Sequence, residues 1–291
     1  MKIISKERNS LVGFLQAEFD TASKTTVKKW IAHGSIRVNG TLETNPAVFI
    51  NPGDVIEYAR QIIRPGKIKS PFPLFFEDDS ILVAEKPAGL LTVGDRGLGG
   101  TSFYRQMSDY VKENSKGKER LFIVHRLDRE VSGLLVFAKS EALQEVIKEH
   151  WHETKKRYYA LVEGQPGNEK GTIRSWLAEG SDQKVRSVKG PEGAKLAITH
   201  YRVMDRTPEY ALLEVDLETG RKNQIRVHLS EMGCPVVGDR RYGADSRFER
   251  RIRLHAFYLS IRHPVTEQAL EFKSKMPKSF LVLKPGDEKY K

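Results

Sequence analysis

Apolar residues recur at two different spacings along the chain, and the spacing changes after about residue 62. In the first part, Leu11, Phe14, Leu15 and Phe19 are spaced as on one face of a helix. Farther along, short apolar runs alternate with polar and glycine-containing segments, which is typical of buried strands. The pattern predicts a small helix-containing module followed by a larger domain built mainly of strands.

Residues 1–62 predict a small unit of two helices and short strands. The second helix should begin at Thr21 or Ser23, both favourable N-cap residues, and should end at Gly34. The Asn-Gly pair at residues 39–40 is typical of a hairpin turn. A generic small α/β module is the simplest interpretation of this pattern.

A proline-rich segment at residues 63–73 separates this unit from the rest of the chain. Its prolines and glycine resist helix and strand alike, so we expect a linker. Residues 74–291 then form the second domain, with helices centred on Val146 and Leu229. We expect an α+β domain with a mixed, largely antiparallel sheet. Its strands are predicted at residues 81–84, 121–124, 133–138, 157–163, 198–204, 210–217 and 254–262.

The chain is strongly basic. It has 49 Lys and Arg residues against 38 Asp and Glu, a formal net charge of +11. This charge favours a polyanionic partner, with nucleic acid first and an anionic membrane surface second. Residues 1–62 hold eight basic and six acidic residues, so the remainder carries 41 against 32, or +9. We therefore expect the larger domain to supply most of the phosphate-binding field.

Cysteine content and hydropathy limit the class of protein. The single cysteine, Cys234, excludes an intramolecular disulfide and a zinc site built on several thiolates. Residues 1–10 lack an apolar core, so we expect no signal peptide, and no apolar run approaches the roughly 20 residues that span a bilayer. We expect a cytoplasmic monomer without a membrane anchor or an obligate protein partner.

One carboxylate, Asp128, lies in a short polar segment between two apolar runs. Arg126 and Arg129 flank it, and the runs at 121–124 and 134–138 predict buried strands. A loop held between two fixed strands is a usual place for a catalytic group. An exposed loop with ordinary ion pairs is the simpler interpretation of an Arg-x-Asp-Arg segment taken alone.

Three motifs of the large domain belong together. The sequence His-Arg-Leu-Asp-Arg-Glu-Val-Ser-Gly-Leu-Leu at residues 125–135 resembles the signature of the RluA-type pseudouridine synthases. Residues 156–160 resemble its Lys-x-Tyr-x-Ala motif, and residues 218–229 resemble its third motif, which residues 235–243 continue. The first 62 residues resemble the S-four-like RNA-binding domain, named for a ribosomal protein. The resemblance implies a synthase-type catalytic domain behind a small RNA-binding domain.

The resemblance implies a catalytic set of Asp128 as nucleophile, Tyr158 in the active site and Arg226 as the charge partner of Asp128. Arg226 would keep Asp128 ionised, and Tyr158 would stack on the base or relay the C5 proton. Attack at C1′, attack at C6 and deprotonation of the sugar all remain open for Asp128. Two positions depart from the family pattern: Asn223 stands where many members have His, and Val131 where Thr is usual.

The resemblance also implies how RNA is bound. The target base must leave its stack, and Arg126 would fill the gap that it leaves. We expect Ile225 and Arg129 to contact the substrate as well, with Arg129 closer to the RNA backbone, and His125 to be a structural hydrogen-bonding residue. Isomerisation oxidises nothing and loses no atom, so we expect no cofactor and no metal.

Three functions compete at this point. The first is an RNA pseudouridine synthase, with large-subunit ribosomal RNA as the expected substrate and transfer RNA as the alternative. The second is a non-catalytic RNA-binding or ribosome-assembly factor, which would have no need of Asp128, Tyr158 and Arg226 together. The third is a glycoside hydrolase, which usually needs a second carboxylate that the motifs do not offer.

Overall fold

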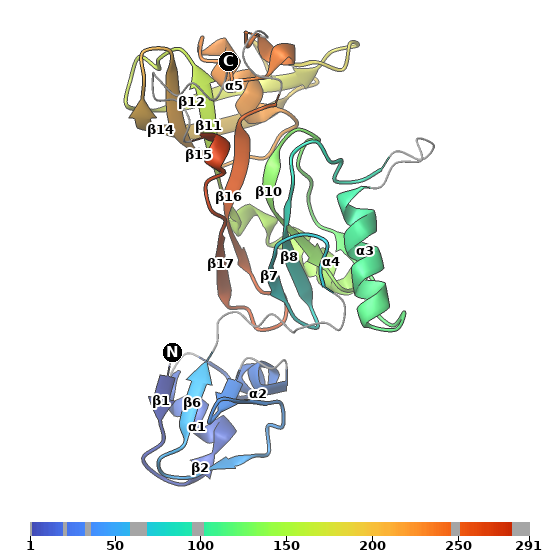
Figure 1. The fold of residues 1–291 in the computed structure, drawn as a ribbon, viewed down its shortest axis with the longest axis vertical. Helices are drawn as coiled ribbons and strands as arrows, with labels where there is room; N and C mark the ends of the chain where they lie inside the picture. The colour runs from blue at the N-terminus through green and yellow to red at the C-terminus, as the bar shows by residue number, and fades with distance from the viewer. Residues whose placement is uncertain are drawn as a thin grey trace.

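The computed structural model describes residues 2–19, 22–32, 36–58, 69–94, 102–245 and 251–280. Its helices and strands form a small unit within residues 2–58 and a large unit that begins at Leu74 (Figure 1). Most of the predicted linker lies outside the described residues. The domain boundaries at residues 62 and 73 therefore stay predictions.

The small unit packs two helices against short strands. Its helices are α1 (Leu11–Glu18) and α2 (Lys24–Ala32). Its main sheet has the order β1-β6-β3-β4, beside a separate β2–β5 pair. The strands are β1 (Lys2–Ile4), β2 (Asn9–Ser10), β3 (Ile36–Val38), β4 (Thr41–Glu43), β5 (Phe49–Ile50) and β6 (Val55–Tyr58).

Local sequence explains where these elements begin and turn. The Ser23 hydroxyl accepts a hydrogen bond from the N–H of Thr26 at 3.1 Å, so Ser23 caps α2 as predicted. The other predicted cap and the predicted stop at Gly34 lie outside the described residues. Asn39 and Gly40 have φ values of 53° and 79°, which a type I′ hairpin turn requires.

The large unit is built on one long sheet. Its strand order is β13-β12-β14-β15-β11-β16-β10-β8-β7, with β9 added to β10 and β17 to β16. Among the described strands, every pair is antiparallel except β10 with β16. The prediction of a mixed, largely antiparallel sheet is confirmed. The strands are β7 (Leu74–Glu77), β8 (Ile81–Lys86), β9 (Phe122–Ile123), β10 (Ser132–Ala138), β11 (Lys155–Glu163), β12 (Lys170–Glu179), β13 (Val185–Val188), β14 (Lys195–Arg206), β15 (Tyr210–Leu217), β16 (Leu254–Arg262) and β17 (Ala269–Lys273).

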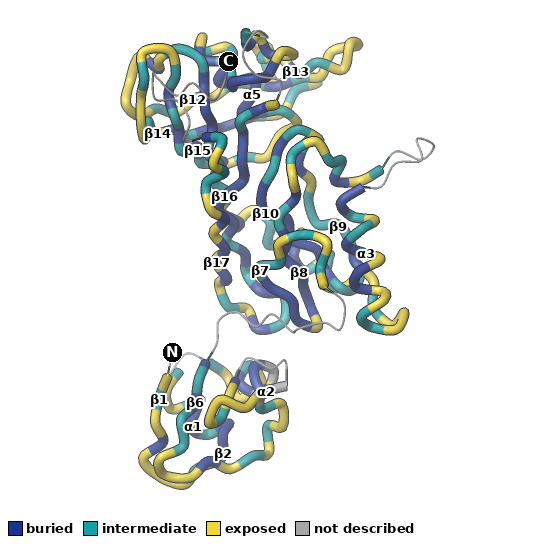
Figure 2. The backbone as a smooth tube through the Cα atoms, viewed as in Figure 1, coloured by how far each residue is buried: buried dark blue, intermediate teal, exposed yellow. Residues whose placement is uncertain are grey.

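Helices cover both faces of the sheet near β8 and β10. They are α3 (Phe103–Asn114) and α4 (Glu141–Glu149), while α5 (Gln224–Glu231) follows β15. Leu135 and Phe137 share a core with residues of α3, whereas Leu134 and Val136 share another with Ile147 of α4. Consecutive residues of β8 and β10 are therefore buried, as the colouring of these strands in Figure 2 shows. Burial on both faces of the sheet explains why their sequences are continuously apolar.

The parallel contact between β10 and β16 brings distant segments together. Ala256 of β16 is paired with Gly133 of β10 on one side and with Tyr158 of β11 on the other. The register shifts between Arg157 and Tyr158, which marks an irregularity in the β11–β16 pair. The loop that precedes β10, which contains Asp128, is thereby set close to Tyr158.

Candidate active site

Asp128 lies in the loop between β9 and β10, and both of its chain neighbours are held by hydrogen bonds. The Thr92 hydroxyl donates to the Leu127 carbonyl at 2.6 Å and accepts from the Leu127 N–H at 3.2 Å. On the other side, the Arg129 carbonyl accepts from the Lys86 ammonium at 3.0 Å. The Asp128 side chain, 30% exposed, is thus presented from a fixed backbone.

Lys86 ties this loop to the sheet. Its side chain is fully buried, and its ammonium also donates to the carbonyls of Pro87 and Leu90 at 2.9 and 2.7 Å. Burial lowers the pKa of Lys86 to about 8, and the negative charges of Glu130 and Asp128 oppose that shift. At neutral pH the ammonium is therefore still mostly charged.

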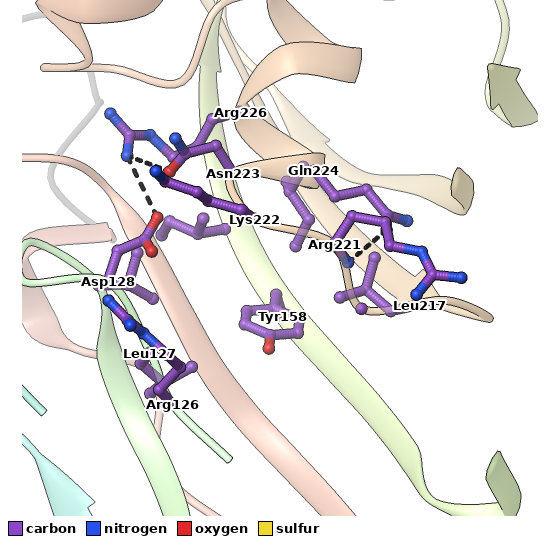
Figure 3. Close-up of a pocket in the computed structure, with 14 residues that line it drawn as sticks. Arg126, Leu127, Asp128, Tyr158, Leu217, Arg221, Lys222, Asn223, Gln224 and Arg226 are labelled. Carbon is purple, nitrogen blue, oxygen red and sulfur yellow. Dashed lines mark hydrogen bonds and ion pairs between the residues drawn. The ribbon is translucent and has the colours of Figure 1, made fainter. Parts of the chain in front are cut away.

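Arg226 connects Asp128 to the interior of the domain. Its Nη1 donates to Oδ2 of Asp128 at 3.2 Å (Figure 3). Its Nε and Nη2 donate to the two carboxylate oxygens of Asp239 at 2.5 and 2.8 Å, and Asp239 is only 1% exposed. Burial alone would lower the pKa of Arg226, but its bonds to Asp239 and the charge of Asp128 outweigh burial and raise it. Arg226 is therefore a permanent cation at this position.

Buried polar side chains hold α5, and so Arg226, against the sheet. The Gln224 amide donates to the Thr199 hydroxyl at 2.9 Å. His228 forms hydrogen bonds of 2.9 Å with the hydroxyls of Thr199 and Ser175. These contacts give Gln224 and His228 of the third motif a structural role.

Tyr158 lies in the same pocket as Asp128 but contributes an uncharged aromatic ring. Burial raises the pKa of Tyr158, and the negative charge of Asp128 raises it further, so the phenol is neutral at physiological pH. Its hydroxyl points away from Arg226 in Figure 3. Arg226 is not among the groups that shift the pKa of Tyr158.

The pocket has a volume of about 330 Å³, within the range of small-ligand sites. Its lining combines charged and apolar side chains, including Arg126, Asp128, Tyr158, Ile225 and Arg226. Within the described ranges, no group of three or more His, Cys, Asp or Glu side chains is placed to hold a metal ion. No helix in that part of the chain is long and apolar enough to cross a membrane.

Comparison with known protein families matches residues 80–231 to RNA pseudouridylate synthase. The chain belongs to this family of RNA pseudouridine synthases. Residues 22–56 match the S4 domain. Both predicted resemblances are confirmed, and so is the prediction of an enzyme that isomerises uridine in RNA.

Relatives match the synthase over nearly its whole length. An uncharacterized RNA pseudouridine synthase of Bacillus subtilis, YlyB, is 32% identical, and the alignment covers 93% of this chain and 91% of the relative. The ribosomal large subunit pseudouridine synthase D of Pasteurella multocida is 30% identical, with 91% and 87% covered. Among solved structures, human RNA pseudouridylate synthase domain containing 4 is 26% identical with a TM-score of 0.60, covering 72% of this chain and 90% of that chain.

The synthase places the predicted substrate-binding residues unequally. Arg126 is exposed at the pocket, and Ile225 is 4% exposed within its lining. Arg129 is exposed and is not among the residues that line the pocket. Its backbone carbonyl instead fixes the loop by accepting from Lys86. His125 accepts a hydrogen bond from the N–H of Val136 at 3.2 Å, which is a structural contact.

Sequence reasoning missed four residues that shape this site. Asp239 and Tyr242 were noted only as part of a motif, and neither had been linked to Arg226. Lys86 and Thr92 were not singled out for the site at all. The buried lysine followed by Pro and Gly was the available indication for Lys86, because a lysine in an apolar strand needs hydrogen-bond acceptors nearby.

Proposed function

We propose that the synthase isomerises specific uridines of large-subunit ribosomal RNA, with Asp128 as the reactive carboxylate. The observation that carries this proposal is the ion pair of Asp128 with Arg226 in a pocket that also contains Tyr158. The relatives that are named as ribosomal large subunit pseudouridine synthases support the choice of RNA.

The reaction breaks the bond from N1 to C1′, turns the freed base and joins C5 to C1′; the C5 proton leaves to solvent and N1 takes up a proton. Asp128 is suited to act as a nucleophile because it is partly exposed to the pocket while Arg226 balances its charge. Attack at C1′, attack at C6 and deprotonation of the sugar each use the same carboxylate. Neutral Tyr158 offers its ring as a surface for the base.

Base flipping accounts for the position of Arg126. A uridine inside a stacked helix cannot reach Asp128, so the base has to leave the stack. Arg126 is exposed at the pocket, two residues before Asp128, and a guanidinium can stack on bases and bind phosphates. We infer that the Arg126 side chain fills the gap in the RNA stack that the flipped base leaves.

The proposal is tested by mapping pseudouridines chemically in cells that lack the gene. We expect at least one large-subunit ribosomal position to lose its pseudouridine and to regain it with the wild-type gene but not with Asp128→Asn. A loss confined to transfer RNA would contradict the proposed target. Full recovery with Asp128→Asn would contradict the proposed nucleophile.

A further inference from the structure

Asn223, at one of the two positions that depart from the family pattern, contacts Arg226 directly. Nη1 of Arg226 donates to Oδ1 of Asn223 at 2.8 Å as well as to Asp128 at 3.2 Å. A guanidinium Nη carries two hydrogens, so each acceptor takes one. Asp239 already binds Nε and Nη2. The side-chain amide oxygen of Asn223 therefore fixes the direction in which Nη1 donates to Asp128.

We propose that Asn223 is a positioning residue that aims Arg226 at Asp128. This inference rests on the proposed role of Asp128. Its premise is that Asp239 holds only one edge of the guanidinium, while Asn223 holds the Nη1 corner that faces Asp128. Without the amide, Nη1 loses its shorter hydrogen bond and its direction is less restricted.

The orientation of the Asn223 amide is itself determined by its surroundings. Arginine only donates hydrogen bonds, so the amide oxygen must face Arg226. The amide nitrogen then donates to the Tyr242 hydroxyl at 3.1 Å, which also accepts from the N–H of Val185 at 3.2 Å. The Tyr242 ring lies 4.9 Å from the Arg226 guanidinium, so one tyrosine supports both partners.

The backbone at Asn223 permits a clean test. Its φ of 55° is left-handed, a conformation that asparagine tolerates and glycine adopts freely. Asn223→Gly therefore removes the amide without straining the chain at the start of α5. Gln183→Gly is the matched control, because Gln183 has a φ of 57°, is exposed and does not line the pocket.

The experiment measures the single-turnover rate at saturating enzyme and the Kd for RNA. We expect Asn223→Gly to slow the rate by at least about tenfold, the lower end of what one lost hydrogen bond to a charged group costs, with Kd within about twofold. Gln183→Gly should match the wild type. Tyr242→Phe removes the hydroxyl that orients the Asn223 amide. Alone it should lower the single-turnover rate, but combined with Asn223→Gly it should lower the rate no further than Asn223→Gly does.

A normal rate for Asn223→Gly, or a loss in Kd as large as the loss in rate, would overturn the inference. Additive losses in the double variant would also overturn it, since the hydroxyl would then act independently of the amide. Asp128→Asn is measured in parallel. If it is inactive while Asn223→Gly is normal, only the inference fails; if Asp128→Asn is active, the proposed role of Asp128 fails.

Discussion

Asp128 and Asp239 bind the same guanidinium from very different surroundings. Asp239 is buried and takes two hydrogen bonds from Arg226, whereas Asp128 takes one and faces the pocket. Asp239 is therefore the structural counterion of Arg226, and one carboxylate oxygen of Asp128 is not bound by Arg226, as the proposed chemistry requires. Arg226 can therefore pair with the proposed reactive carboxylate while Asp239 also balances its charge.

Replacing Arg226 should damage both stability and turnover. In Arg226→Met, Asp239 is left buried without its charged partner, and such losses typically cost about 3–5 kcal/mol. We expect that drop in the free energy of unfolding by urea denaturation, together with a loss of turnover. Arg226→Lys, which keeps the charge but not the paired geometry, should fall in between. Wild-type turnover in Arg226→Met would show that Asp128 does not need this cation.

His125 should make the fold sensitive to acid. Burial lowers the pKa of His125 to about 3, with the positive charge of Lys156 adding to the effect, while an unfolded histidine has a pKa of about 6.5. The stability contributed by neutral His125 is therefore present above about pH 6.5 and is lost as the pH falls toward 3.

The matched variant is His125→Gln, whose amide oxygen can take the place of Nε2 and accept from the N–H of Val136 without titrating. Between pH 7.5 and pH 5, the wild type should lose about 2 kcal/mol more unfolding free energy than the variant. Urea denaturation at the two pH values gives the difference. Equal losses in both proteins would mean that His125 is already able to take up a proton in the folded state.

At the scale of elements, the close approach of β10 and β16 depends on Gly133. Its φ is 128°, and a Cβ there would lie 2.3 Å from the Ala256 carbonyl oxygen. Ala256 is a backbone neighbour of Tyr158 as well, so a shift of this strand changes the geometry of both sides of the pocket.

Gly133→Ala should therefore lower turnover as well as stability. Gly117→Ala is the control, because Gly117 has a φ of 81° but nothing within 4 Å of its added Cβ. We expect Gly117→Ala to cost about 1–2 kcal/mol of stability from backbone strain and to keep full activity. Activity assays and urea denaturation of both variants separate the two effects. Equal behaviour of the two variants would show that the contact with Ala256 is dispensable.

The elements that could be predicted were those with a strong apolar pattern. The predicted strands of the large domain and the helices α4 and α5 all occur. Strand β12 was missed because its exposed and half-buried positions alternate with few apolar side chains. Helix α3 was missed although Phe103, Met107 and Tyr110, which lie on its buried face, follow helical spacing.

The candidate site was predictable where a continuous motif carried it. Asp128, Tyr158 and Arg226 came from three such motifs, and all three line one pocket. The hydrogen bonds of Asn223 and Asp239 to Arg226 depend on folding. They form only when the start of α5 meets the segment around Asp239 that follows the helix. No periodicity in the sequence specifies such a contact.

At the scale of the whole molecule, the small module and the large domain have separate cores. Leu11, Trp30 and Ile56 belong to a hydrophobic cluster confined to the module. The module carries +2 of the net charge of +11. It should therefore contribute local recognition, while the large domain supplies most of the attraction for phosphates.

Deleting residues 1–62 should leave a folded large domain. We expect residual activity on short RNA, because the pocket lies entirely within the large unit, and weaker binding to structured ribosomal RNA. Circular dichroism, turnover of a short substrate and a binding titration test the three parts. An insoluble fragment, or unchanged binding to structured RNA, would contradict independent folding or the RNA-binding role of the module.

We propose that Asp128 performs the chemistry in a site held by Arg226. The most direct measurement follows tritium release from C5-labelled uridine in RNA with purified wild-type enzyme and Asp128→Asn, alongside a binding titration for each. We predict that Asp128→Asn binds RNA with a Kd close to the wild-type value and releases no tritium above background. Release near the wild-type rate would contradict the claim.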